Sequence, residues 1–236
     1  MNKWIYENAG ADWARPAALQ ELIDFQPAKK GVEEYLRSKI SSKFSKKYSG
    51  KSLSNGLFDL NIKWGWKDPR NGPALPIWRE IWPDMKIIHV TRHGVDVASS
   101  LQTRSGKNWE EDMNRFSKWM KINSWKNSKL PIRRGQRAAT ISHAFDFWSE
   151  QLTIENKTLQ EYDFVHQIRY EDLLTKPEQE IKKLWNFIGV EDDDVLLEKI
   201  SSSIDGSRAF AYRNNHELSD FAATKKEILE SFGYSI

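Results

Sequence analysis

An arginine and a serine spaced for binding an anion are the clearest chemical signal in this sequence. Arg92 follows a short apolar run, and Ser100 comes eight residues later. A guanidinium stays protonated and can grip two phosphate oxygens at once. On a helix that begins near Val95, the Ser100 hydroxyl lies just beyond the first turn and could reach the same anion. The alternative is an ordinary ion pair between Arg92 and Asp96, with Ser100 a plain helix serine.

The residues around Arg92 predict a strand, a tight turn and a helix. Residues 85–91 form a β-branched run after a Pro83-Asp84 turn, and Gly94 stands between Arg92 and the helix start. Open α/β sheets hold ligands at the carboxyl ends of their strands, and helix N-termini bind phosphate. This order of elements therefore predicts a phosphate site at Arg92.

The other elements predict an α/β fold with a mostly parallel sheet flanked by helices. A second strand is expected over 164–170, followed by a helix from Pro177 that Gly189 ends. Helical spacing and a first-turn proline predict two helices before residue 60. We expect a single domain, 1–236, with a helical region over 1–60 and an α/β nucleotide-binding core over 61–236.

Composition narrows the class of protein. The chain has 236 residues, eleven Trp and a formal net charge of +3, with basic residues mostly scattered among acidic ones. This balance suits a small anionic ligand and gives no sign of nucleic-acid binding. No cysteine is present, so disulfides and cysteine-based metal sites are excluded. No apolar run is long enough to span a bilayer and no secretory signal begins the chain, which favours a cytoplasmic protein.

Three segments together resemble a known family. Residues 82–101 are similar to the 3′-phosphate-binding segment of sulfotransferases that use 3′-phosphoadenosine 5′-phosphosulfate (PAPS). Residues 64–70, Trp-Gly-Trp-Lys-Asp-Pro-Arg, resemble a motif common in the bacterial branch. Residues 168–174 resemble the Tyr-Glu-Asp-Leu segment of the family. The resemblance covers about residues 64–189 in the family order and implies a three-layer, P-loop-like fold.

The resemblance also implies roles for individual residues. Arg92 and Ser100 would bind the 3′-phosphate, and Tyr170 would lie beside the nucleoside, although a core tyrosine at a strand end is the alternative. Lys67 would stabilise charge at the bridging oxygen of the phosphosulfate, since a compact ammonium suits negative charge that develops there. Arg213 belongs to a looser match with a C-terminal basic segment that closes over the same phosphate.

The chain departs from the family pattern near its start. The family has a strand followed by a loop of the type P-x-S/R-G-T-[ST], which cradles the 5′-phosphosulfate. No such segment occurs here. Gly50-Lys51-Ser52 matches only the end of a Walker-type loop, which would need glycine where Ser45 stands, so we do not expect it to bind phosphate. The first 16 residues resemble a segment that follows this loop in bacterial relatives. We therefore expect an N-terminally truncated sulfotransferase.

The catalytic base is the least defined part of the prediction. Asp68, beside Lys67, is the nearest group able to accept a proton, though an ordinary aspartate is a weak base. His89 reads as a satisfied core histidine, and His93 as better exposed but close to the phosphate. The remaining histidines lack metal-ligand spacing, so no metal is expected. The aromatic residues Phe145, Phe147 and Trp148 are most simply core.

Several functions remain open from the sequence. The leading one is transfer of a sulfuryl group from PAPS to a hydroxyl or amine of a small-molecule or carbohydrate acceptor. The second is a non-catalytic protein that binds 3′-phosphoadenosine nucleotides, or nothing. A P-loop kinase or NTPase is disfavoured by the incomplete Walker sequence, and a basic nucleic-acid module ranks last.

Overall fold

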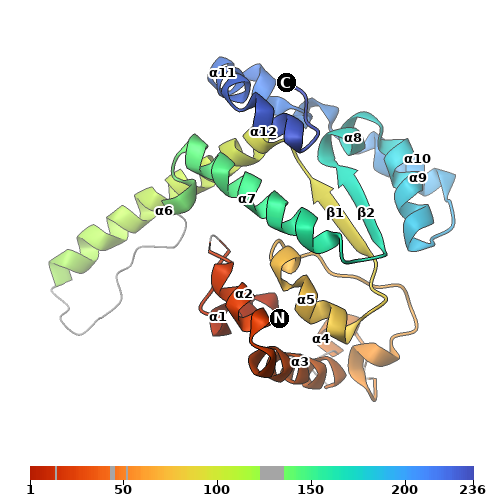
Figure 1. The fold of residues 1–236 in the computed structure, drawn as a ribbon. Helices are drawn as coiled ribbons and strands as arrows, with labels where there is room; N and C mark the ends of the chain where they lie inside the picture. The colour runs from red at the N-terminus through yellow and green to blue at the C-terminus, as the bar shows by residue number, and fades with distance from the viewer. Residues whose placement is uncertain (14, 43–45, 52, 123–135) are drawn as a thin grey trace. The chain divides into compact units, whose positions relative to one another are not determined.

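A computed structural model describes residues 1–13, 15–42, 46–51, 53–122 and 136–236 (Figure 1). Helices dominate it, and a small parallel sheet lies in the second half of the chain. The elements are α1 (Asn2–Asn8), α2 (Ala17–Asp24), α3 (Gln26–Ser41), α4 (Lys46–Ser49), η2 (Gly56–Asp59), α5 (Asn71–Ile81), β1 (Ile87–Thr91), α6 (Gly94–Ile122), η3 (Gln136–Ala138), α7 (Ile141–Leu159), β2 (Val165–Arg169), α8 (Tyr170–Thr175), α9 (Pro177–Ile188), α10 (Asp194–Ser202), η4 (Gly206–Arg208), η5 (Ala211–Asn214), α11 (His216–Thr224) and α12 (Lys226–Ser231), where η marks a 3-10 helix.

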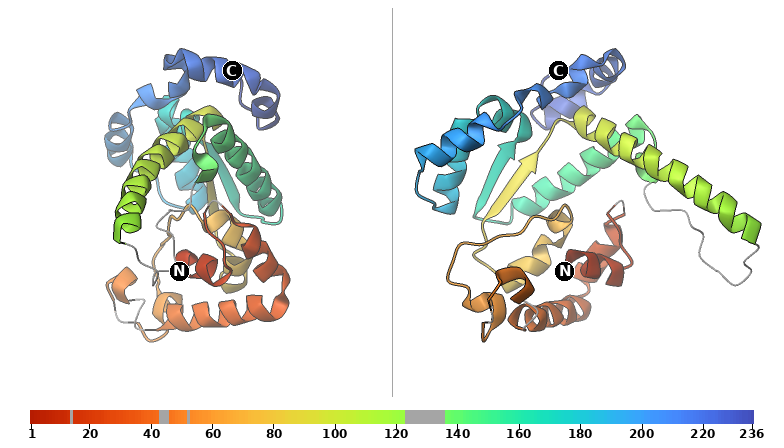
Figure 2. Two further views of the ribbon diagram at one scale, coloured as in Figure 1. Left: turned by 90° about the vertical axis from the view of Figure 1, so that its left-hand side faces the viewer. Right: turned by 180° about the vertical axis from the view of Figure 1, so that it is seen from behind.

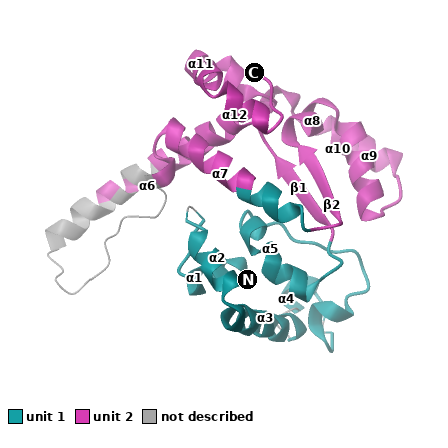
Figure 3. Ribbon diagram, viewed as in Figure 1, with its two compact units in different colours: residues 1–85, 154–161 teal, residues 86–153, 162–236 magenta. Residues whose placement is uncertain are grey.

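The chain divides into two compact units, shown in teal and magenta in Figure 3. Unit 1 contains residues 1–85 and 154–161, and unit 2 contains residues 86–153 and 162–236. The single domain expected from the sequence, with a boundary near residue 60, stays a prediction.

Unit 1 forms because its helices present apolar stripes to a common core. Val32, Leu36 and Ile40 recur at every fourth position of α3 and are buried, as helical periodicity requires. They pack in one cluster with residues of α2 and α5, including Trp78. The two predicted N-terminal helices are thereby confirmed as α2 and α3.

Unit 2 contains the sheet. β1 and β2 lie side by side and run parallel, as the front and rear views show (Figures 1 and 2). Ile87 is opposite Val165, and Thr91 is opposite Arg169. The predicted α/β class with a parallel sheet is confirmed, although each strand is shorter than expected. Among the described residues the sheet has these two strands.

The helix after β2 follows the sequence pattern closely. Pro177 is the first residue of α9, and Ile181 and Trp185 bury one face of it. Gly189 adopts a left-handed conformation, with φ of 73°, which costs glycine little because it has no Cβ atom. The predicted start and end of this helix are confirmed.

A second core lies where α6 meets α7 and the C-terminal helices. Val95 and Ala98 of α6 pack with the buried aromatic residues Phe145, Phe147 and Trp148. The prediction that these aromatic residues are core is confirmed. None of the described helices combines the length and the apolar composition needed to cross a membrane.

Candidate functional site

Arg92 lies where an anion-binding residue is expected in an α/β fold. It directly follows β1, and α6 begins two residues later at Gly94. Helix α6 is long, so its N-terminus adds positive potential at this end of the sheet. The Arg92 side chain is 25% exposed, and its Nε atom is buried without a hydrogen-bond partner among the described residues. A ligand can therefore reach the exposed part of the Arg92 side chain, whereas Nε lies below the surface without a hydrogen bond.

Three groups fix the Arg92 side chain. Its guanidinium lies 4.8 Å from the centre of the Tyr170 ring. Nη2 is 3.4 Å from the Asp96 carboxylate and donates to the carbonyl oxygen of Arg208 at 3.4 Å. The ion pair with Asp96 that we considered as an alternative is thus present, but Asp96 is buried rather than on the surface. The ion pair with Asp96 fixes the position of the Arg92 side chain.

Asp96 also holds the C-terminal segment against α6. Its second oxygen accepts a hydrogen bond from the backbone N–H of Tyr212 at 2.8 Å. Asp96 therefore links Arg92 to the segment that contains Arg213. The Arg213 guanidinium stacks on the Phe210 ring at 4.4 Å. Phe210 is the one described non-glycine residue with positive φ, at 50°. Such strain persists only where surrounding contacts fix it, and here the contacts are those of the Arg213 segment.

His93 is wrongly predicted as the better-exposed histidine. It is 0% exposed, because the chain turns inward after Arg92 and its ring stacks on Tyr212 with centroids 4.3 Å apart. Burial first, and then the charges of Arg213 and Arg92, lower the pKa of His93 to about 4. The ring is therefore neutral at physiological pH and serves as a packing residue beneath the site.

Glu171 is a second buried carboxylate at the same place. One of its oxygens accepts a hydrogen bond from the backbone N–H of His93 at 2.9 Å, and the other has no partner among the described residues. Burial raises the pKa of Glu171, and the charge of Asp96 acts in the same direction. The hydrogen bond ties the turn after β1 to α8, and so fixes Arg92 relative to Tyr170.

Ser100 lies farther along α6 and is exposed. Six residues separate it from Gly94, which corresponds to roughly 9 Å along a helix axis. Arg92 contacts both Tyr170 and Asp96, and Asp96 binds the backbone of Tyr212, next to Arg213. Ser100 shares only the helix α6 with Asp96. Its role as a phosphate ligand stays a prediction.

Lys67 and Asp68 lie in unit 1, in a loop between η2 and α5. Lys67 is exposed. The tryptophan before it, Trp66, donates from Nε1 to Asn71 at 2.8 Å and packs against Trp64, Trp78 and Trp82. The loop backbone is therefore anchored while the Lys67 ammonium is in solvent. The structure describes this pair and the Arg92 site each within its own unit.

Asp68 is held by a neighbour in sequence. The Arg70 guanidinium donates to both Asp68 oxygens at 2.8 and 2.9 Å, and the Arg70 backbone N–H donates to one of them. Partial burial acts to raise the pKa of Asp68, but these hydrogen bonds and the charge of Arg70 outweigh it, so the pKa is lowered. A lowered pKa makes Asp68 a weaker proton acceptor than an ordinary aspartate.

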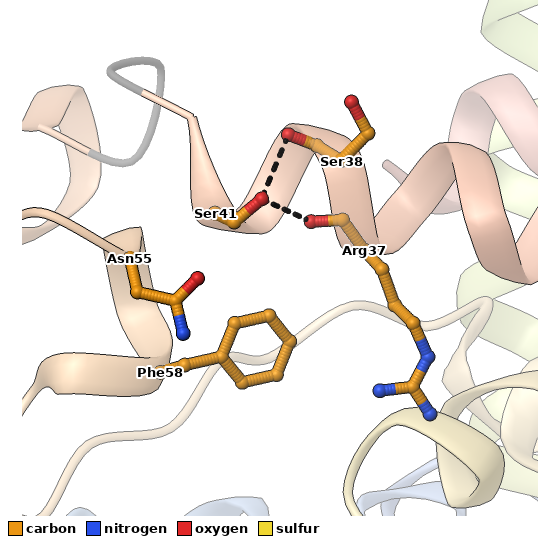
Figure 4. A pocket seen from close by; sticks show the side chains of 5 residues that line it. All are labelled: Arg37, Ser38, Ser41, Asn55 and Phe58. Atoms are coloured by element: carbon orange, nitrogen blue, oxygen red, sulfur yellow. Dashed lines mark hydrogen bonds between the residues drawn. The ribbon is translucent and has the colours of Figure 1, made fainter.

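Other features of the described chain carry no site. Gly50 and Lys51 of the partial Walker-type match follow the short helix α4 rather than a strand. Ser45 and Ser52 lie outside the described residues. A surface hollow in unit 1 is lined by Arg37, Ser38, Ser41, Asn55 and Phe58 (Figure 4). The Ser41 hydroxyl there donates to helix carbonyls, and none of the predicted site residues lines the hollow. The described residues contain no group of three or more metal-ligating side chains.

Two contributors to the site were not anticipated. Glu171 and Tyr212 both hold parts of the Arg92 environment from distant positions in the chain. The position of Glu171 directly after the predicted strand over 164–170 was the available signal. Nothing in the sequence around Tyr212 indicates its partner, Asp96, which lies 116 residues away.

Comparison with known proteins provides the classification. No curated protein and no solved structure gave a significant match. A profile described as the sulfotransferase family matches residues 5–194, which includes Lys67, Arg92, Ser100 and Tyr170 but ends before Arg213. The α/β architecture with its parallel sheet is consistent with that family. Since the match covers most of the 236 residues, the chain belongs to the sulfotransferase family, which indicates an enzyme class that transfers sulfuryl groups.

Proposed function

We propose that this chain binds PAPS by its nucleotide end and takes part in sulfuryl transfer to a hydroxyl or amine acceptor. The observation that carries the proposal is the Arg92 guanidinium, which is oriented by Tyr170 and Asp96 at the end of β1 and retains a buried, unpartnered Nε atom. Arg92 would bind the 3′-phosphate, and Ser100 and Arg213 would be further phosphate ligands. Tyr170 would lie against the nucleoside.

The reaction we propose is an in-line displacement. The acceptor oxygen or nitrogen forms a bond to sulfur while the bond from sulfur to the 5′-phosphate oxygen breaks. The acceptor loses its proton, and 3′-phosphoadenosine 5′-phosphate leaves. Lys67 would stabilise the charge on the leaving oxygen. Asp68 is the proposed proton acceptor in this loop, and its pair with Arg70 makes it a weak one.

A second candidate is a nucleotide-binding protein without transfer activity. The sequence lacks a P-x-S/R-G-T-[ST] loop, and among the described residues β1 has no strand on its outer side. Either feature would leave the sulfate end of PAPS poorly held. A cytoplasmic location and a small-molecule or carbohydrate acceptor remain predictions for both candidates.

Calorimetry with 3′,5′-adenosine bisphosphate tests the binding that both candidates share. Charge-assisted hydrogen bonds contribute about 1.5–3 kcal/mol each, so Arg92→Ala should weaken binding about a hundredfold. Arg137→Ala, at an arginine paired with Glu150, is the matched control and should bind like the wild type. Equal binding by wild type and Arg92→Ala would refute the site.

Transfer of labelled sulfate from PAPS to a panel of hydroxyl and amine acceptors then separates the candidates. We expect very weak or no turnover by the isolated chain, with nucleotide binding intact. Robust turnover that is lost in Lys67→Ala would instead establish the chain as a complete enzyme and reject the second candidate.

A further inference from the structure

Two carboxylates are buried around the single guanidinium of Arg92. The Asp96 side chain is 4% exposed, and Glu171 is 2% exposed. When both are ionised, they place two negative charges against the one positive charge of Arg92. Arg213, on the segment that Asp96 holds, adds a second positive charge, which brings the sum only to zero. The ionised side chains around Arg92 therefore supply no net positive charge for a phosphate.

Each of these carboxylates has one oxygen in a hydrogen bond and one without. Asp96 Oδ1 accepts from the Tyr212 backbone N–H at 2.8 Å, and Glu171 Oε1 accepts from the His93 backbone N–H at 2.9 Å. Asp96 Oδ2 and Glu171 Oε2 are buried and have no hydrogen-bond partner among the described residues. The Arg92 guanidinium, 3.4 Å away, compensates the charge of Asp96 Oδ2. Glu171 Oε2 is therefore the oxygen that a proton would stabilise most.

The surroundings of Glu171 already favour its protonated form. Burial raises its pKa, and the charge of Asp96 acts in the same direction, while the His93 N–H and the charge of Arg92 act against them. Two other titratable groups lie nearby, and both are neutral at physiological pH. The pKa of His93 is lowered to about 4, and burial raises that of Tyr234 to about 12.

The remaining charged groups around α8 bear less on this carboxylate. Asp172 of α8 and Arg169 of β2 act on Tyr234 with opposite signs. The charged side chains of η4 and α9, which pack against α8, are exposed or paired with each other, as in Asp205, Arg208, Glu180 and Lys183. Water and salt screen exposed charges. The charges that govern the carboxylate are therefore those of Asp96 and Arg92.

A phosphate at Arg92 would shift this balance further. A phosphate monoester carries close to two negative charges near neutral pH, and a nearby like charge disfavours the ionised form of a carboxyl group. The phosphate would also compete with Asp96 for the Arg92 guanidinium. Protonation of Glu171 removes one of the charges that repel the phosphate.

We propose that Glu171 takes up a proton from solvent when the 3′-phosphate binds at Arg92, so that nucleotide affinity falls as pH rises. The proton is bound at Oε2 and returns to solvent when the nucleotide leaves. Because the pKa of Glu171 is then higher in the complex than in the free protein, the complex holds more protons at any pH between the two values. This inference rests on the proposed nucleotide binding.

Calorimetry of the full chain with 3′,5′-adenosine bisphosphate, in buffers of different ionisation enthalpy, measures the protons taken up. One proton per nucleotide corresponds to a tenfold fall in affinity per pH unit, so the wild type should approach that slope between about pH 6 and 8. The nucleotide phosphates also titrate near pH 6, but their contribution is the same for every variant.

Glu171→Gln separates the carboxyl group from the rest of the site. Its amide oxygen can still accept from the His93 N–H, and its side chain is neutral like the protonated glutamate. This variant should lose the proton uptake seen in the wild type and bind the nucleotide about tenfold more tightly near pH 8, since one repelling charge is gone. Glu178→Gln, at an exposed carboxylate of α9, is the matched control and should keep the wild-type uptake and slope.

Infrared difference spectra of the wild type give a second readout that needs no variant. A protonated carboxyl C=O band should appear when the nucleotide binds, and 13C labelling of glutamate alone should shift it. A band that does not shift would place the proton on an aspartate such as Asp96 and overturn the proposal.

The outcomes distinguish this inference from the function on which it rests. If the wild type does not bind the nucleotide, both are overturned. If it binds without proton uptake, or without the carboxyl band, only the proton uptake by Glu171 is refuted. Equal uptake by the wild type and Glu171→Gln would refute it as well and would assign the proton to another group, such as His93.

Discussion

Two candidate regions, one in each unit, are built by different kinds of contact. The Lys67 loop, residues 64–70, holds Asp68 through Arg70, two positions away in the sequence. The Arg92 corner, which comprises Arg92, His93 and Asp96, is held by residues 78 and 116 positions away. Short-range contacts form whenever the loop forms, whereas long-range contacts require the whole of unit 2 to be folded. The Arg92 corner is therefore the part whose chemistry depends on tertiary structure.

The largest expected effect concerns the scaffold of the Lys67 loop. Trp78 is 1% exposed, packs on Trp66 and Trp82, and donates from Nε1 to Asn2. Trp78→Ala should lower the free energy of unfolding by about 3–5 kcal/mol, because it opens a cavity and leaves Asn2 unsatisfied. Urea unfolding measures this. Phe25→Ala, at a 62% exposed residue, is the control and should change stability by less than about 0.5 kcal/mol.

The next effect concerns the pH dependence of the Arg92 corner. The pKa of His93 is about 4, against an ordinary value of 6.5, so between these values the unfolded chain binds a proton that the folded chain does not. Stability is therefore lost as pH falls from 6.5 towards 4, by about 3 kcal/mol from this residue.

Replacement of His93 tests that dependence. His93→Phe keeps an aromatic ring against Tyr212 and removes two ring nitrogens that have no described partner. Its stability should change less between pH 7 and 4 than that of the wild type, as measured by urea unfolding at each pH. His143→Phe, at an exposed histidine, should retain the wild-type slope. An unchanged slope in His93→Phe would show that His93 is not buried in its neutral form.

The smallest effect belongs to the local ion pair. The folded-state pKa of Asp68 is lowered, so its stabilising contribution is present above the ordinary aspartate pKa and disappears as pH falls through the lowered value. Asp68→Asn should cost about 0.5–1 kcal/mol at pH 7 and nothing at strongly acidic pH. A loss larger than that of Trp78→Ala would show that the pair, rather than the tryptophans, organises the loop.

Much of the fold was predictable because its signals are local. The stripe of Val32, Leu36 and Ile40 predicted α3, and Pro177 and Gly189 marked both ends of α9. The strand before Arg92 followed from its β-branched residues. The division into units was not predictable, because it depends on which apolar faces meet across the chain. The burial of His93 depends on Tyr212, which is distant in sequence.

By itself the sequence determined the residue types at the site and the order strand, turn, helix that places Arg92 at the end of β1. Backbone propensity and spacing are enough for that, because both act over a few residues. Only the tertiary structure decided that Asp96 and Glu171 are buried beneath Arg92 and that Tyr170 stacks on it. These outcomes depend on packing between distant segments, which no local pattern encodes.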